Sequence, residues 1–568
     1  MATTEISRSY REPGPGGAGS ASAEPGRPLS AALLYRRCDS TDLPFELVSE
    51  LEDPSGPIGQ DRAVEAVEFA VQMRRKGYNI YALGPSGTGK HTVIEDLLRQ
   101  RANSMPTPPD WCYVNNFADP QKPHRLQLPP GRATRLREAM RRLVEELRAA
   151  LPAAFERDDY RARREVIDQQ FRERNEQAFG ELQRRAEQKG IAMLRTPMGL
   201  ALAPRRDGKV LTPEMFEGLP EAERERIQHD LEEVQGELEA VMQKVPQWER
   251  EHREAVRELN RATTGGAIAV MMNELRAGYQ DLPDVAQYLD EVERDIKENA
   301  DNFLPTVQPH EGTPIPAAVE EALSEARFRP YQVNVIVDNS SQHGAPVIYE
   351  DNPTHQTLVG RVEHIARFGT LVTDFNLLTP GALHRANGGY LLLDAQRLLA
   401  GNFGWASLKR ALNAGEIRIE TLEQLLSLAS TVSLQPDPIP LDVKVVVLGP
   451  PLLYYLLSAL DDDFKELFKI AADFDDRVER TPETSLLYAR FVAGVVRREK
   501  LLPFDRSAVA RAIEQASRLV GDSDRLSTGL RGIVDLLQEA DQVAVGASKD
   551  IVTAAEVQRA IDAPIPPR

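Results

Sequence analysis

The sequence predicts an α/β fold in which helices sandwich a sheet, with a long helical insertion inside the sheet domain and an all-helical domain after it. A glycine-rich turn at 84–89 lies between an apolar, strand-like run and a helix-like segment. A second apolar run, Tyr390–Leu393, ends in Asp394. Between them, residues 131–303 are rich in Glu, Arg and Gln and carry apolar residues at helical spacing. These three observations predict the class.

The composition is typical of a soluble protein with several domains. The 568 residues correspond to about three or four domains. The formal net charge of -18 excludes a whole-surface electrostatic grip on nucleic acid or anionic lipid. Cys38 and Cys112 have neither metal-ligand spacing nor a disulfide framework. The N-terminus has no apolar signal core, and glycine and proline interrupt the most apolar stretch, Val445–Leu460. We therefore expect a cytoplasmic protein without membrane contact.

Changes in composition along the chain predict five segments. The first is rich in Gly, Ala, Ser and Pro and lacks an apolar period, which is typical of a disordered tail. The expected division is a tail at 1–30, the first part of the α/β domain at 31–130, a helical insertion at 131–303, the second part of the α/β domain at 304–483 and a helical lid at 484–568.

Periodicity predicts the elements of the α/β segments and the lid. A helix is expected at 62–75, a strand at 78–83, a helix at 89–102 and a strand at 111–114. Later strands are expected at 333–337, 389–394 and 443–448, and lid helices at 486–500, 506–520, 526–545 and 554–561.

The insertion is expected to form a helical arm. Apolar residues alternate four and three positions apart over 227–245, which is the seam of an antiparallel coiled coil. The seam is shorter than three heptads, so it predicts a short arm rather than a long rod. Turn residues within 190–210 predict a small β-hairpin element. In the basic stretch Arg132–Arg148, glutamates interleave with the arginines, which favours a solvated helical face.

The glycine-rich turn carries the strongest chemical signal. Residues Gly84–Lys90 match the pattern G-x-x-x-x-G-K. Glycines allow backbone angles that point successive N–H groups inward, and these groups bind phosphate together with the positive end of the following helix. The lysine neutralises phosphate charge. The expected nucleotide-binding residues of this turn are Gly84, Pro85, Ser86, Gly87, Thr88, Gly89, Lys90, His91 and Thr92.

The position after the lysine departs from the usual pattern. A hydroxyl that ligates Mg²⁺ normally follows the lysine, and His91 stands there instead. A neutral imidazole is a poor ligand for Mg²⁺. Thr92 lies about 100° further round the helix, so it does not simply substitute. The sequence therefore leaves metal affinity and turnover open.

The strand that ends in Asp394 has the Walker B pattern. A carboxylate at the carboxyl end of such a strand organises the Mg²⁺ that bridges the phosphates, so we expect Asp394 to be the metal ligand and a catalytic residue. Hydrolytic enzymes usually carry a glutamate next, which orients the attacking water, but this chain has Ala395. Glu363 is a candidate replacement base.

Read together, these residues resemble the Lon protease family, in its Lon-like AAA+ branch with a long helical insertion (the LonC type), over residues 31–568. A histidine after the phosphate-loop lysine and an Asp-Ala pair at the Walker B strand are familiar for this branch. The stretches that carry the resemblance are Ile58–Ala63, Tyr113–Phe117, Gly381–Tyr390, Leu408–Leu412, Ile439–Val445, Phe464–Phe474 and Asp524–Ser527.

The resemblance implies an AAA+ P-loop NTPase that uses ATP and Mg²⁺. Such proteins form a homo-oligomeric ring, commonly a hexamer, which threads unfolded or damaged protein substrates through a central pore. The family also carries a C-terminal peptidase domain with a Ser–Lys dyad. This chain ends at Arg568, after the lid, so we expect it to lack the peptidase half and to work beside a separate peptidase.

The resemblance also implies roles for individual residues. In its terms, Gly59 and Gln60 lie beside the adenine, and Arg531 is the lid arginine that senses the γ-phosphate. A trans-acting arginine from the neighbouring subunit is expected, and a pore loop before the Walker B strand is expected to grip substrate. The candidates are Arg410 and Arg477 for the trans arginine, and Phe368 with Gly369 for the pore loop.

Two other functions stay open. His91 and Ala395 favour a non-hydrolysing, nucleotide-stabilised scaffold or gate for protein degradation, as does Gly449–Pro451, where a polar sensor residue is expected. A DNA-associated ATPase is the third reading, based on the arginines of 132–148. The net charge of -18 argues against nucleic acid as a partner.

Overall fold

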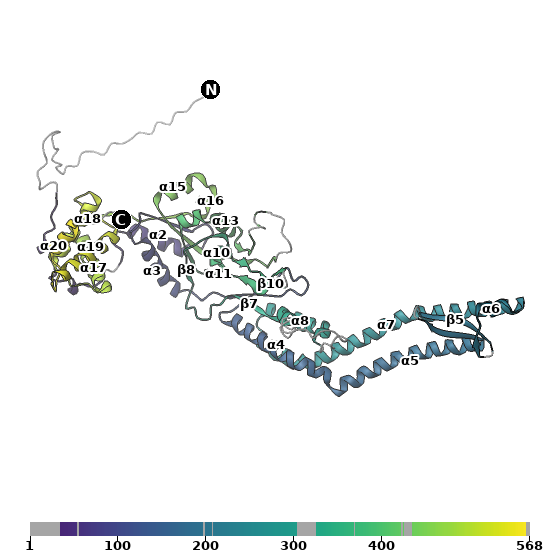
Figure 1. The fold of residues 1–568 in the computed structure, drawn as a ribbon. Coiled ribbons are helices and arrows are strands. Elements are labelled where there is room, and N and C mark those ends of the chain that lie inside the picture. Colours follow the sequence, from purple (N-terminus) through teal and green to yellow (C-terminus); the bar gives the residue numbers. More distant parts are fainter. Residues whose placement is uncertain are drawn as a thin grey trace, which may run out of the picture. The chain divides into compact units, whose positions relative to one another are not determined.

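The computed structural model describes residues 35–563 except 54–55, 197–198, 207, 304–324, 368–369, 422–423, 425 and 427–433. The chain forms two compact units, the first from Met1–Leu97 and Val447–Arg568 and the second from Leu98–Val446 (Figure 1). The tail expected at 1–30 lies outside the described residues.

A parallel pair of strands forms the centre of the first unit. β1 (Ile80–Leu83) pairs in parallel with β17 (Ile470–Asp473), with Leu83 opposite Asp473. All four residues of β1 are buried, as expected for an apolar run in a parallel sheet. α2 (Asp61–Gln72) packs against β17, and α3 (Lys90–Asn103) follows the glycine-rich turn. The expected strand–turn–helix order is confirmed.

Four helices form the lid, as the periodicity predicts. Their bounds are α17 (Pro482–Glu499), α18 (Arg506–Val520), α19 (Leu530–Gly546) and α20 (Ala554–Asp562). The expected start of the third helix at 526 is wrong, because residues Arg525–Ser527 form strand β19, which pairs with β18 (Arg477–Glu479). These backbone groups bond across the hairpin instead of along a helix.

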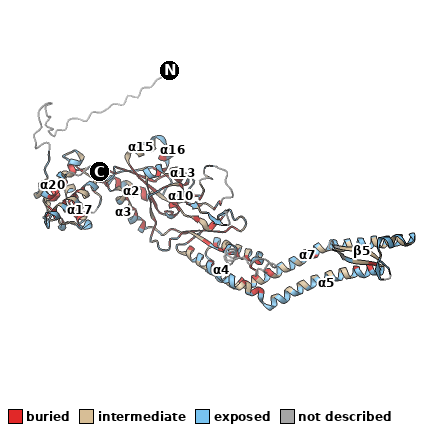
Figure 2. Ribbon diagram, viewed as in Figure 1, coloured by how far each residue is buried: buried red, intermediate tan, exposed pale blue. Residues whose placement is uncertain are grey.

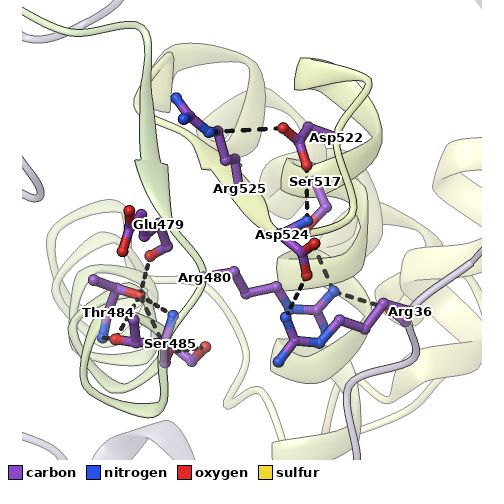
Figure 3. A network of polar contacts seen from close by, with 10 residues as sticks. Arg36, Glu479, Arg480, Thr484, Ser485, Ser517, Asp522, Asp524 and Arg525 are labelled. Carbon is purple, nitrogen blue, oxygen red and sulfur yellow. Dashed lines mark hydrogen bonds and ion pairs between the residues drawn. The ribbon is translucent and has the colours of Figure 1, made fainter. Parts of the chain in front are cut away.

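A segment near the N-terminus completes the core of the lid. Leu43, Phe45 and Val48 are buried in the same apolar cluster as residues of α17, α18 and α19. Arg480, just before α17, donates from Nη1 to the backbone oxygen of Arg36 at 2.9 Å (Figure 3). Arg36 in turn pairs with Asp524 at 2.8 Å. The lid therefore depends on residues that lie far away in the sequence.

A second parallel pair of strands lies in the second unit. β8 (Val347–Glu350) pairs with β13 (Tyr390–Asp394), and Leu393 lies opposite Glu350. Strand β16 (Lys444–Gly449) contains the boundary between the two units. The short helices of this region are α10 (His355–Val359), α11 (Ala382–Arg385), α12 (Ala395–Ala400) and α13 (Gly404–Ala414). The strands of its hairpins and short pairs are β9 (Arg361–Val362) with β12 (Leu378–Thr379), β10 (Ile365–Arg367) with β11 (Thr370–Val372), and β14 (Glu416–Ile417) with β15 (Ile439–Pro440).

A separate antiparallel sheet supports the base of the arm. β2 (Asp110–Val114) lies between β3 (His124–Leu128) and β7 (Val333–Val337). α4 (Arg132–Glu156) and α8 (Pro283–Glu298) share one apolar core with this sheet. The strands expected at 111–114 and 333–337 are therefore present, and they pair with each other.

The helical insertion extends as an arm (Figure 1). α5 (Asp158–Gln188) leads outward and α7 (Glu221–Ala277) returns beside it. α7 has 57 residues, about 85 Å at 1.5 Å per residue, so the arm exceeds the short one that the seam predicts. Figure 2 shows that both helices are largely exposed. The far end carries the expected β element, β4 (Ile191–Thr196), β5 (Gly199–Arg206) and β6 (Lys209–Val210), and then α6 (Pro213–Glu217).

Two further helices, α15 (Pro451–Leu460) and α16 (Asp462–Leu467), follow β16. Although α15 is apolar, it is short. Among the residues that the structure describes, no helix is long and apolar enough to cross a lipid bilayer.

Candidate functional site

The glycine-rich turn connects the carboxyl end of β1 to the start of α3. Gly87 and Gly89 have φ values of 90° and 73°, which side chains other than glycine rarely adopt. A Cβ added at Gly84 would lie 2.8 Å from the Cβ of Phe474 and 2.9 Å from its carbonyl oxygen. The glycines thus allow the turn that precedes α3, whose 14 residues present their positive end to it.

Lys90 folds over this turn. Its Nζ donates to the carbonyl oxygens of Gly84 at 2.7 Å and Pro85 at 3.1 Å. The Thr88 hydroxyl also donates to the Pro85 oxygen, at 3.1 Å. A cation, a helix N-terminus and an open glycine backbone therefore meet at one place, and this donor set fits a phosphate group.

His91 and Thr92 differ in their surroundings. His91 Nδ1 lies 3.5 Å from Glu95 Oε2, one helical turn further on. Thr92 is exposed to solvent. The imidazole thus lies beside a carboxylate of its own helix, at the position where the usual motif has a hydroxyl.

Gly59 and Gln60, the residues expected beside the adenine, contact the segment after β17. A Cβ at Gly59, where φ is 63°, would lie 2.7 Å from Val478. Gln60 is buried, and its side-chain amide bonds both to the carbonyl oxygen and to the N–H of Asp475, at 3.0 and 3.1 Å. The Gln60 amide is therefore committed to the protein backbone.

Arg531 lies close to the glycine-rich turn. It is the second residue of α19, and its Cβ is 3.7 Å from the position of a Cβ built on Gly87. Arg477, a trans-arginine candidate in the same unit, pairs with the adjacent Asp476 at 2.8 Å. The structure thus brings together, within the first unit, the turn, Gly59–Gln60 and Arg531.

Asp394 stands at the carboxyl end of β13 in the second unit. Its Oδ1 accepts a hydrogen bond from the N–H of Arg397 at 2.9 Å, so it caps α12. The next residue, Ala395, is buried. On the neighbouring strand Glu350 accepts from Arg385 at 2.9 Å. Glu350 is a second carboxylate at this sheet edge that sequence reasoning missed, and its partner arginine indicates a structural ion pair.

The other candidates of the second unit are engaged or lie outside the described residues. Glu363 pairs with Arg361 at 2.6 Å. Arg410 pairs with Glu420 at 2.6 Å, at the rim of a small pocket that contains the buried His355. Phe368 and Gly369 lie outside the described residues, so the pore-loop assignment stays a prediction.

Close backbone contacts explain the glycine-rich stretch before β13. A Cβ on Gly389 would lie 2.1 Å from the carbonyl oxygen of Pro346, and one on Gly381 would lie 2.2 Å from that of Leu358. Both neighbours are backbone atoms, which cannot move aside cheaply. Gly389 is therefore required for the packing that places β13 beside β8, and Gly381 for the close contact with α10.

His384, in the same stretch, is buried in an uncharged state. The N–H of Gly381 donates to its Nδ1 at 3.2 Å. Its Nε2 has no hydrogen-bond partner among the residues that the structure describes. Burial lowers the pKa of His384 to about 3.

Acidification is expected to destabilise the second unit through His384. A histidine in the unfolded chain titrates near pH 6.5, so the unfolded state binds one more proton between about pH 6.5 and 3. Stability is therefore retained above about pH 6.5 and falls as the pH approaches 3, by up to about 1.4 kcal/mol per pH unit. His384→Asn, whose amide oxygen can still accept from Gly381, should flatten the pH dependence of the urea midpoint. His229→Asn, at an exposed histidine of α7, is the control and should leave the slope unchanged. Equal slopes for the His384 variant and the unmodified protein would contradict this expectation.

Sequence reasoning missed three residues around the turn: Phe474, Asp475 and Thr528. Phe474 packs on Gly84, and Thr528, at 1% exposure, donates from Oγ1 to the carbonyl oxygen of Asp475. Buried threonines and backbone carbonyl contacts leave no periodic signal. Among the described residues, no cluster of three or more His, Cys, Asp or Glu side chains could hold a metal ion.

Three family models match parts of the chain. They are a LonB-like AAA domain over residues 343–475, the lid domain of archaeal LonB AAA+ ATPases over 503–565, and a Lon-like LonC helical domain over 110–143. The first covers β13 and Asp394, the second covers most of the lid, and the third covers β2, β3 and the start of α4.

Curated relatives agree with these models. The archaeal Lon protease of Archaeoglobus fulgidus is 28% identical over 230 residues, 40% of this chain and 36% of that protein. Those of Thermoplasma volcanium and Halobacterium salinarum are each 25% identical, over 39% and 40% of this chain. The match spans 32–36% of the length of these three relatives.

Solved structures show a weaker similarity. RuvB from Thermotoga maritima has a TM-score of 0.20 and 14% identity, and it covers 32% of this chain and 47% of its own. NtrX from Brucella abortus has a TM-score of 0.26 and 16% identity, covering 50% and 63%. Scores this low do not bear on function.

Proposed function

Since this chain carries Lon-like AAA+ ATPase and lid domains, we propose that it binds ATP and Mg²⁺ at the turn Gly84–Lys90 and uses ATP hydrolysis to unfold and move protein substrates. The geometry of the turn supports this most directly. A helix N-terminus, an open glycine backbone and the Lys90 ammonium group converge there, and Arg531 of the lid lies beside Gly87.

The proposed roles follow from the chemistry of each group. Lys90 neutralises phosphate charge, and backbone N–H groups of the turn orient the phosphates. Arg531 senses the γ-phosphate from the lid. Mg²⁺, when bound, withdraws charge from the phosphates, and Asp394 is the carboxylate that we propose to hold it.

The proposed partners are unfolded or damaged proteins, further copies of this chain in a ring, and a separate peptidase. The relatives are called proteases, and the match covers 32–36% of their length. The peptidase partner is proposed from that name. We place this activity in the cytoplasm.

Phosphate release from ATP, measured with and without Mg²⁺ alongside the mass in solution, tests the proposal. We expect Mg²⁺-dependent turnover by an oligomer. Asp394→Asn should retain nucleotide binding and lose about nine-tenths or more of this turnover, because a neutral amide holds Mg²⁺ poorly. Full turnover in the variant would contradict the role of Asp394.

A non-hydrolysing scaffold or gate is the second candidate. It is favoured by the buried Ala395 in the place of a glutamate and by the ion pair that engages Glu363. Tight ATP binding with phosphate release at background would support the scaffold and would contradict the motor.

A further inference from the structure

A row of hydrogen bonds in the first unit runs from Gln60 toward the lid helix that carries Arg531. The side-chain amide of Gln60 donates to the carbonyl oxygen of Asp475 at 3.0 Å and accepts from its N–H at 3.1 Å. Gln60 is 3% exposed, so water does not compete for these bonds. The amide therefore fixes one peptide group of the segment after β17.

Thr528, in the loop before α19, bonds to the same segment after β17. Its hydroxyl donates to the same Asp475 carbonyl oxygen, and its N–H donates to the carbonyl oxygen of Asp476 at 3.1 Å. A carbonyl oxygen has two lone pairs, and Gln60 and Thr528 each use one of them. The segment after β17 is thus held between the start of α2 and the loop before α19.

Hydrogen bonds also hold the loop before α19 in place. The hydroxyl of Tyr488 donates to the carbonyl oxygen of Ser527 at 2.9 Å, and the N–H of Gly529 donates to the Ser527 hydroxyl at 3.0 Å. β19 pairs with β18 immediately before it, and the N–H of Arg480, the residue after β18, donates to the carbonyl oxygen of Asp524 at 2.8 Å. Thr528 is therefore the point at which the lid loop is joined to the sheet side of the first unit.

Arg531 lies three residues after Thr528. Its Cβ is 3.7 Å from the Cβ position of Gly87, so a small shift of the loop would change what its long side chain can reach. We infer that Thr528 and Gln60 are positioning residues that hold Arg531 over the phosphate-binding turn, so that the preference for ATP over ADP depends on hydrogen bonds away from the phosphates. This inference rests on the proposed ATP-binding function.

The test compares affinities for ATPγS and ADP, each with Mg²⁺, by calorimetry on the full chain. Arg531→Ala should weaken ATPγS binding about tenfold, the size expected for one charge-assisted hydrogen bond, and should leave ADP binding within about twofold. Thr528→Val keeps the size of the side chain and removes the hydroxyl, and it should reproduce most of this loss. Thr528→Ser, which retains the hydroxyl, should restore the preference.

A double variant separates positioning from a general loss of structure. If Thr528 acts through Arg531, Thr528→Val combined with Arg531→Ala should bind ATPγS no more weakly than Arg531→Ala alone. An unchanged ratio of ATPγS to ADP affinity in Thr528→Val would overturn the inference. Equal losses for both nucleotides, or additive losses in the double variant, would also overturn it.

Loss of all nucleotide binding has a different meaning in the variant and in the unmodified protein. If Thr528→Val binds neither nucleotide, Gln60→Ala decides, because it loosens Asp475 and leaves Thr528 intact. A lower ATPγS-to-ADP ratio in that variant supports the inference, and an unchanged ratio overturns it. If the unmodified protein binds neither nucleotide, the proposed function itself is wrong, which is a different result from a failure of the positioning residues.

Discussion

Lys90→Ala is expected to weaken ATP binding about 100-fold or more. The ammonium group is the only side-chain cation that the turn itself supplies, and in the structure it bridges the carbonyl oxygens of Gly84 and Pro85. Its loss removes a charge-assisted contact to phosphate and also loosens the turn, and two effects of about 1.5 kcal/mol each correspond to that factor. Titration of a fluorescent ATP analogue measures it.

The matched control is Lys465→Ala, at an exposed lysine of α16 in the same unit. This variant carries the same change in net charge and should bind ATP like the unmodified protein. Equal affinities of the Lys90 variant and the control would contradict the assignment of the turn as the phosphate site.

Gly389→Ala is expected to prevent stable folding of the second unit. The added methyl group would lie 2.1 Å from the carbonyl oxygen of Pro346 and 2.8 Å from its Cδ. That oxygen accepts from the N–H of Tyr390 at 2.8 Å, at the start of the pairing between β8 and β13. The methyl group can be accommodated only if this pairing opens, so we expect a loss of about 3–5 kcal/mol or more. Soluble yield and thermal unfolding measure the effect.

Gly180→Ala provides the control for this substitution. Gly180 lies within α5, and a Cβ there would meet nothing within 4 Å. Alanine in such a place should stabilise the protein by up to about 1 kcal/mol, because it favours the helix. If the Gly389 variant unfolds at the same temperature as this control, β8 and β13 must pair differently.

Local patterns in the sequence were sufficient to predict the elements that carry the candidate site. The strand, glycine-rich turn and helix around Lys90 follow from apolar runs and glycine spacing, and α18 has the predicted bounds. Asp394 ends its strand as expected. These features depend on residues that are close together in the chain, and periodicity reports such features well.

Contacts between distant residues could not be predicted in this way. Nothing local indicates that Leu43 and Phe45 complete the lid core, or that Arg525–Ser527 pair with β18 instead of beginning a helix. The length of α7 could not be predicted either, because the heptad pattern ends near Val245 whereas the helix continues to Ala277. The segment boundaries inferred from composition stay predictions.

The pairing of the N-terminal segment with the lid has a consequence for synthesis of the chain. Leu43 and Phe45 leave the ribosome several hundred residues before their packing partners in α17 and α18. Because synthesis proceeds at about 5–20 residues per second, these apolar side chains remain unpacked for tens of seconds until α17 and α18 have been made. During that interval they are a natural target for chaperones that bind nascent chains. A fragment that begins after Phe45 would lack these side chains, so the apolar core of its lid would be incomplete.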